Sequence, residues 1–123
     1  MPINQILMRI AIPTNDRETI FPRTGQAKLF AIYEIDSKKS IFVEFRENPH
    51  KHEEHENDKD SAHNHRDMVL ALNDCDALLV KMAGKHLTND FSAAKISLFK
   101  TQENQIQCVA TSFAKNPAAH PEI

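Results

Sequence analysis

Alternating apolar and polar positions predict three strands in the first third of the chain. Residues 8–13 alternate in this way and end at Pro13. Residues 29–35 are rich in aromatic and β-branched side chains, which favour strands. After a polar turn at residues 36–39, residues 41–46 alternate in the manner of a half-buried edge strand. The short connections predict that the three strands form an antiparallel meander.

Beyond residue 65 the apolar spacing predicts helices that alternate with strands. Apolar side chains recur every three or four residues over residues 64–73, which indicates a short helix. The nearly continuous apolar run at residues 76–82 is typical of a central parallel strand. A second helix follows Gly84, and residues 96–100 form a fifth strand. We expect Thr101 to cap a third helix. The apolar positions of the second and third helices are Leu87, Phe91 and Ala94, and Ile106, Val109, Ala110 and Phe113.

This element order predicts a three-layer α/β fold with a five-stranded mixed sheet and three helices. Right-handed crossovers favour the strand order 3-2-1-4-5, with strand 2 antiparallel to the others. That order is typical of ribonuclease H-like folds. A length of 123 residues fits one domain, with a core at about residues 8–113 and a C-terminal tail at residues 114–123.

The same topology brings three connections to one end of the sheet. Residues 15–28, 48–65 and 83–86 all follow or precede strands at the end where the first and fourth strands finish. This is a switch point, where open α/β sheets bind ligands. The only two glycines, Gly25 and Gly84, fall there. Glycine permits positive φ or close backbone approach, although both can equally be ordinary turn or helix-start glycines.

The histidine-rich segment, residues 48–65, is the main chemical signal in the sequence. It has one alanine and no larger apolar residue, so we expect a solvated or disordered loop. Five of the seven histidines lie in this segment, interspersed with many carboxylates. The five histidines are His50, His52, His55, His63 and His65. Imidazole is a common ligand for zinc, nickel and other borderline metals. The spacing matches no closed zinc motif, and an acidic loop that binds metal loosely is the alternative.

Cationic side chains accompany both glycines. Arg23 and Lys28 flank Gly25, and Lys85 and His86 follow Gly84 at the start of a helix. Cations together with free N–H groups at a helix N-terminus favour an anion site. Ordinary surface charge explains each residue taken alone.

Overall composition excludes several classes of function. The formal net charge of −2, without a basic stripe, argues against nucleic acid and anionic membranes as partners. No apolar run approaches the roughly 20 residues of a membrane span. Two separated cysteines indicate a reducing compartment, so we expect a cytoplasmic protein. They are too few to ligate an iron–sulfur cluster alone, which takes about four. We expect Cys75 to be buried, Cys108 to pack or lie on the surface, and Met8, Met68 and Met82 to occupy core positions.

Enzyme motifs are missing from the expected places. Ribonuclease H-like nucleases hold two metal ions with carboxylates in strand 1 and at the end of strand 4. Here residues 8–13 contain no carboxylate, and Asp74 and Asp76 fall at the start of the fourth strand. The chain also lacks a phosphate-binding loop and a serine nucleophile motif. These observations favour a binding protein over an enzyme.

Several segments resemble the dinitrogenase iron–molybdenum cofactor biosynthesis family, in the form of its NifX and NifB C-terminal domains. They are MRIAIPTND, PRTGQAKLFAIYEID, VEFRENPHKHEEH and NDCDALLVKMAGKHLTNDFSAAKISLF. The resemblance implies a ribonuclease H-like fold and a protein that binds or carries iron–sulfur or iron–molybdenum clusters without catalysis. It also implies a protein partner for cluster transfer. The chain departs from the family where Arg23 and Thr24 replace a common His-Phe pair, and where Gly84 stands without a second glycine.

Three hypotheses follow from the sequence. The first is a cluster carrier that uses the five histidines of the segment together with Arg23, Gly25, Gly84 and Lys85. The second is a divalent metal-ion buffer or sensor that uses the same histidines. The third is a scaffold that binds a protein partner without metal.

Overall fold

A computed structural model describes residues 7–49, 66–117 and 120–123 of the chain. The strands are β1 (Leu7–Thr14), β2 (Leu29–Asp36), β3 (Lys39–Glu47), β4 (Ala77–Val80) and β5 (Ser97–Lys100). The helices are α1 (Arg66–Ala71), α2 (Lys85–Ala93) and α3 (Ile106–Lys115), with a short 3-10 turn, η1 (Thr24–Gln26). Each strand and helix expected from the sequence is present. Within the described ranges, no helix has the length and apolar composition needed to cross a membrane.

The strands form one sheet in the order β3-β2-β1-β4-β5. β2 runs antiparallel to both β1 and β3, whereas β4 is parallel to β1 and β5 is parallel to β4. In this register Ile10 of the central strand lies opposite Tyr33 on one side and Ala77 on the other. The mixed five-stranded sheet is therefore confirmed, and its ribonuclease H-like label stays a prediction.

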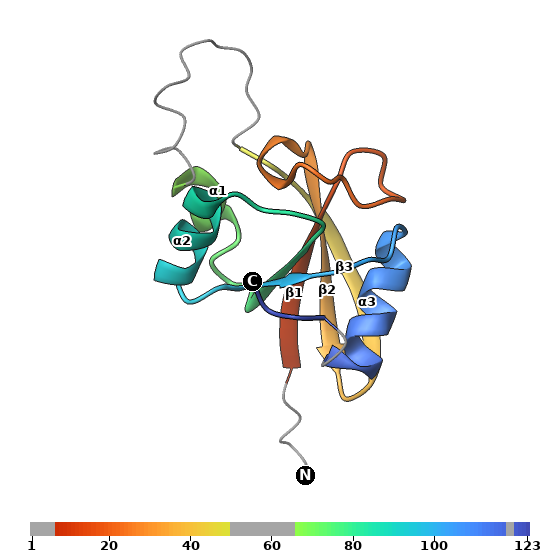
Figure 1. Cartoon of the computed structure of the whole chain (residues 1–123). Coiled ribbons are helices and arrows are strands. Elements are labelled where there is room, and N and C mark those ends of the chain that lie inside the picture. Colours follow the sequence, from red (N-terminus) through yellow and green to blue (C-terminus); the bar gives the residue numbers. More distant parts are fainter. Residues whose placement is uncertain (1–6, 50–65, 118–119) are drawn as a thin grey trace.

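Helices cover both faces of the sheet, α1 and α2 on one face and α3 on the other (Figure 1). Strand side chains alternate between the two faces, so each face has its own apolar cluster. Phe30, Leu78 and Leu98 pack with α1 and α2 in one cluster. Ile10 and Leu79 pack with α3 in the other. We call the end of the sheet where β1, β3 and β4 finish the upper end.

β3 is more exposed than its sequence pattern suggests. Ile41, Phe42 and Val43 have 48%, 46% and 37% of their surface exposed. β3 lies at the edge of the sheet, and its register against β2 shifts between Ile32 and Tyr33. Val43 has no partner in that register, so a bulge interrupts the alternation. The expectation of a half-buried edge strand was wrong over these three residues.

The third helix begins later than expected. Its N-cap is Gln105, not Thr101. Thr101 is buried at the end of β5, where its backbone N–H donates to the Val80 carbonyl at 2.9 Å. Its hydroxyl oxygen accepts a hydrogen bond from the Glu103 N–H at 3.2 Å. Thr101 therefore ends a strand and shapes a loop, which leaves the helix to start four residues further on.

The last described residues lie along β5. The N–H of Lys100 donates to the Pro121 carbonyl, and the N–H of Ile123 donates to the Leu98 carbonyl, both at 2.9 Å. His120 is buried, and its ring packs edge-on against Phe113 of α3 with 5.5 Å between ring centroids. These contacts extend the sheet beyond β5 within the part assigned to a tail from the sequence.

Candidate functional site

The loop between β1 and β2 crosses the upper end of the sheet and reaches β4. Arg23 forms a parallel bridge with Met82, just beyond the end of β4. The Thr24 hydroxyl donates to the Met82 carbonyl at 3.0 Å, and Thr24 is almost fully buried. The loop around Gly25 and the loop before Gly84 are therefore in direct contact, as the topology predicts.

The other end of the same loop is attached to the end of β3 through Asn48. The Asn48 N–H donates to the Lys28 carbonyl at 2.9 Å, and its side-chain amide donates to the Ala27 carbonyl at 2.8 Å. The Lys28 N–H in turn donates to the Asn15 side-chain oxygen at 2.8 Å. Asn48 is fully buried, which corrects its assignment to a solvated loop. The last described residues before the histidines, Asn48 and Pro49, therefore lie beside the first loop.

The first loop is also fixed internally and on its α3 side. The Asp16 carboxylate accepts from the N–H groups of Glu18 and Thr19 and from the Thr19 hydroxyl. Hydrogen bonds from Thr19 and Glu18 lower the pKa of Asp16 to about 2. The Ile20 N–H donates to the Asn104 carbonyl at 2.9 Å, which ties the loop to the chain before α3. The upper end is thus built from backbone with few degrees of freedom.

Gly25 and Gly84 both lie beside open space. Gly25 is in η1, and Gly84 is the N-cap of α2, with φ of −74° and no side-chain hydrogen bond to the helix end. Neither glycine has a positive φ, and a Cβ added to either would meet no atom of the described residues within 4 Å. Backbone strain and crowding by the described residues therefore do not explain these glycines.

Exposed cations border this open space. The cationic side chains of Arg23, Lys28 and Lys85 are all exposed, and the imidazole of His86 is exposed beside them. The ion pairs found within the described ranges involve other residues, so these cations are not neutralised there. The first backbone N–H groups of α2 add partial positive charge at the same place. This part of the upper end favours an anion.

Met82 corrects one prediction and adds a group that the sequence reading missed. Met68 is fully buried and Met8 packs against the α3-side core, as expected. Met82, in contrast, has 56% of its surface exposed. Its position just after a buried strand signalled a core residue, but the chain turns toward Gly84 there. A thioether therefore stands at the upper end, beside Arg23 in the bridge.

The five predicted metal ligands lie outside the described residues, and these are His50, His52, His55, His63 and His65. Across residues 7–49, 66–117 and 120–123, no three histidine, cysteine or carboxylate side chains gather in a way that could hold a metal ion. Metal ligation by the segment stays a prediction.

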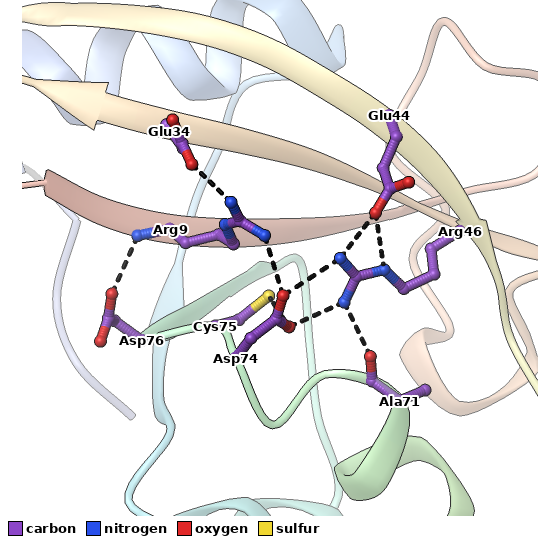
Figure 2. Close-up of polar contacts among 8 residues, drawn as sticks. All are labelled: Arg9, Glu34, Glu44, Arg46, Ala71, Asp74, Cys75 and Asp76. Atoms are coloured by element: carbon purple, nitrogen blue, oxygen red, sulfur yellow. Dashed lines mark hydrogen bonds and ion pairs between the residues drawn. The ribbon is translucent and has the colours of Figure 1, made fainter.

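A second polar cluster, which was not predicted from the sequence, joins β1, β2 and β3 to the loop before β4 (Figure 2). Asp74, in the loop before β4, lies between two guanidinium groups, with oxygens 2.8 Å from Arg9 and 2.8 Å from Arg46. Arg9 also pairs with Glu34 at 2.5 Å, and Arg46 pairs with Glu44 at 2.7 Å. We call these five residues the charged network. Its charges largely satisfy one another, so it fastens the α1–β4 connection to the sheet.

Arg46 makes most of the contacts that hold the α1–β4 connection against the sheet. Its guanidinium also donates to the Ala71 carbonyl, the last residue of α1, at 2.8 Å. The side-chain hydrogen bond to Asp74, followed by the one to Glu44, raises the pKa of Arg46. Hydrogen bonding to Arg46 is the largest cause that lowers the pKa of Asp74 to about 2.

Cys75 lies next to Asp74 of the charged network, but its thiol is unreactive. It has 5% of its surface exposed and packs with the α1 and α2 cluster, as predicted. Burial raises the pKa of its thiol to about 12, and the nearby Asp74 carboxylate adds to the rise. The thiol is therefore protonated at neutral pH and is a poor metal ligand or nucleophile. Cys108 is exposed on α3.

Fold and upper end together define the class of this protein: an α/β domain that presents fixed backbone, cations and a thioether at the ends of its strands. The sequence model of the family described as "Dinitrogenase iron-molybdenum cofactor" matches residues 7–116, so the chain belongs to that family. The resemblance noted in the sequence is confirmed. No curated protein matches the chain.

Solved structures share the fold at low sequence identity. The apo form of the orange protein from Desulfovibrio gigas has a TM-score of 0.68 and 18% identity, covering 94% of this chain and 92% of its own. A candidate dinitrogenase from Methanocaldococcus jannaschii has a TM-score of 0.66 and 17% identity, covering 96% of each chain. A candidate NifB protein from Thermotoga has a TM-score of 0.63 and 18% identity, covering 94% of this chain and 92% of its own. At these identities the likeness concerns the fold alone.

Proposed function

We propose that this protein binds and carries an anionic metal cluster, of the iron–sulfur or iron–molybdenum type, as cargo at the upper end of the sheet. It acts without catalysis, in the cytoplasm, and passes the cluster to a protein partner. The single observation that supports this most is the match of residues 7–116 to the iron–molybdenum cofactor family. The geometry of the upper end gives the match a physical basis.

The groups at the upper end suit such a cargo. Clusters of this type carry negative charge and expose sulfur, so they favour cations and N–H donors on the protein. Arg23 and Lys85 supply the charge, and Gly25 and Gly84 leave the space beside the backbone open. The thioether of Met82 is a soft group that suits soft metals.

The histidines would supply the directional ligands. The segment that contains them begins after Asn48, whose side chain and N–H hold Ala27 and Lys28. Lys28 is thus held directly, and Arg23 lies five positions before it in the same loop. We propose that imidazoles from His50, His52, His55, His63 and His65 coordinate metal atoms of the cargo, while Arg23 and Lys85 compensate its charge.

Anaerobic reconstitution tests this function. The untagged protein is incubated with purified iron–molybdenum cofactor, with ferrous iron and sulfide, or with zinc or nickel, then desalted and analysed for metal and visible absorption. We expect one cluster species to survive desalting, and zinc or nickel to be lost. The triple variant His50/His52/His55→Ala should retain at least tenfold less cluster. Neither remaining histidine is a suitable control, because His120 is buried and His86 lies at the upper end, so the exposed Gln107→Ala on α3 serves instead.

Retention of zinc or nickel with no cluster would contradict the proposal and favour a metal-ion buffer. Binding of neither would leave only the scaffold hypothesis. The methionine methyl groups add a second readout by nuclear magnetic resonance, because Met82 is exposed and Met68 is fully buried. Bound cluster should shift or broaden the methyl signal of Met82 more than that of Met68, and an unchanged Met82 signal would place the cargo elsewhere.

A further inference from the structure

We propose that Thr24 and Asn48 are positioning residues that hold residues 23–28, here called the strap, in place across the upper end of the sheet. The inference rests on the proposed function and deepens it, because the strap contains Arg23 and Gly25. If the strap is held in this way, the fold fixes the backbone position of Arg23 at the proposed cargo site.

One end of the strap is held by β4. The Thr24 hydroxyl donates to the Met82 carbonyl at 3.0 Å, while the neighbouring Arg23 backbone bridges to Met82. Thr24 is 2% exposed, so water cannot easily replace this hydrogen bond. The contact fixes Arg23 beside the chain that leads to Gly84 and Lys85.

The other end of the strap is held by β3. Asn48 is fully buried and donates from its side-chain amide to the Ala27 carbonyl at 2.8 Å. Its N–H donates to the Lys28 carbonyl at 2.9 Å, and Asn15 accepts from the Lys28 N–H. Between these two attachments η1 is closed by its own hydrogen bonds, from the Gln26 N–H to the Arg23 carbonyl and from the Ala27 N–H to the Thr24 carbonyl.

The strap therefore spans the upper end between β3 and β4, above the ends of the two strands that separate them. Both attachments use buried polar side chains, which cost free energy when their partners are lost. Buried polar groups that are fully hydrogen-bonded specify one arrangement of the backbone. Thr24 and Asn48 thus set where Arg23 and Gly25 stand relative to Gly84 and Lys85.

The test uses Thr24→Val, which keeps the shape of the side chain and removes only the hydroxyl. Thr24→Ser restores the hydroxyl and is the rescue variant. Thr101→Val is the matched control, because Thr101 is equally buried but its hydroxyl bonds within its own loop. Asn48→Asp, which removes the amide donor, tests the second attachment and is decisive should Thr24→Val unfold.

Two measurements are made on each variant. The first is amide hydrogen exchange at Gln26, Ala27 and Lys28, and the second is retention of purified iron–molybdenum cofactor with its visible spectrum. We expect Thr24→Val and Asn48→Asp to exchange these amides about fivefold faster and to retain about fivefold less cofactor, with a shifted absorption band. Thr24→Ser and Thr101→Val should match the wild type in both measurements.

Unchanged amide exchange in Thr24→Val and Asn48→Asp would overturn the proposal. So would faster exchange with unchanged retention, because the residues would then be structural only. Failure of the wild-type protein to retain any cluster would refute the proposed function instead. In that case amide hydrogen exchange alone decides whether Thr24 and Asn48 hold the strap in place.

Discussion

Two groups of charged residues in this protein differ in how their charges are used. In the charged network, Arg9 and Arg46 each bond two carboxylates and share Asp74 between them. At the upper end, Arg23 and Lys85 stand exposed beside open backbone, without an ion pair to the described residues. The same side-chain types therefore fasten elements in one region and leave charge available to a ligand in the other.

The difference distinguishes charges that the fold itself uses from charges that are available to a ligand. A guanidinium whose donors are all satisfied by the protein has little left to offer an incoming anion. An exposed cation beside free helix N–H groups costs the fold little and gains most from a bound anion. The lack of an ion pair, more than the presence of a charge, marks the region in which to look for a ligand.

The largest expected effect is the contrast between two arginines. Arg46→Ala removes bonds to Asp74, Glu44 and the end of α1, so we expect the free energy of unfolding to fall by about 2 kcal/mol. Arg23→Ala should change it by less than about 0.5 kcal/mol. Urea denaturation followed by circular dichroism measures both. Equal losses would remove the distinction between the two regions.

The charged network should also shape the response to acid. Hydrogen bonding to Arg46 holds the pKa of Asp74 at about 2, below its ordinary value of 3.8. A lowered carboxylate pKa stabilises the fold above pH 3.8, and that contribution is lost as the pH falls through about 2. Asp74 is partly exposed, so we expect Asp74→Asn to cost only about 1 kcal/mol at pH 7.

That cost should shrink between pH 3.8 and pH 2, and denaturation curves at several pH values would show the trend. In an Arg46→Ala background this trend should weaken, because hydrogen bonding to Arg46 is the largest cause that lowers the pKa of Asp74. A cost for Asp74→Asn that stays constant down to pH 2 would mean that its charge plays no part.

The smallest expected effect concerns the open backbone of the upper end. Gly25 has a negative φ and free space where a Cβ would stand. Gly25→Ala should therefore raise the free energy of unfolding by about 0.5 kcal/mol, because it restricts the unfolded chain. Gly84→Ala should instead lower it by a few tenths of a kcal/mol, since alanine is the poorer N-cap. Thermal unfolding of both variants distinguishes the two signs.

Local periodicity was enough to predict the sheet. The apolar run of β4 and the alternation of β1 are properties of neighbouring residues, and short connections with right-handed crossovers left one simple strand order. The same order placed the first loop and the chain beyond β4 at one end of the sheet, as the bridge between Arg23 and Met82 confirms.

The misses all depend on contacts between distant residues. The bond from Arg9 to Asp74 spans 65 positions and the bond from Arg46 to Asp74 spans 28, so no local pattern announces them. The sequence placed Asn48 at the start of a polar, solvated segment. Its hydrogen-bond partners, Ala27 and Lys28, lie in the loop between β1 and β2, about 20 residues earlier in the chain. Met82 was predicted to be a core residue because it follows a buried strand. Its contacts with Arg23 and Thr24 of the first loop cannot be predicted from the local sequence.

Burial of Cys75 simplifies chemical work on this protein. With the thiol shielded and its pKa raised to about 12, alkylating reagents at neutral pH should find one reactive sulfhydryl among the two cysteines, that of Cys108. A maleimide dye or spin label would then report from a single known helix. The upper end of the molecule, next to the start of α3, could be followed by such a probe without engineering a cysteine-free background.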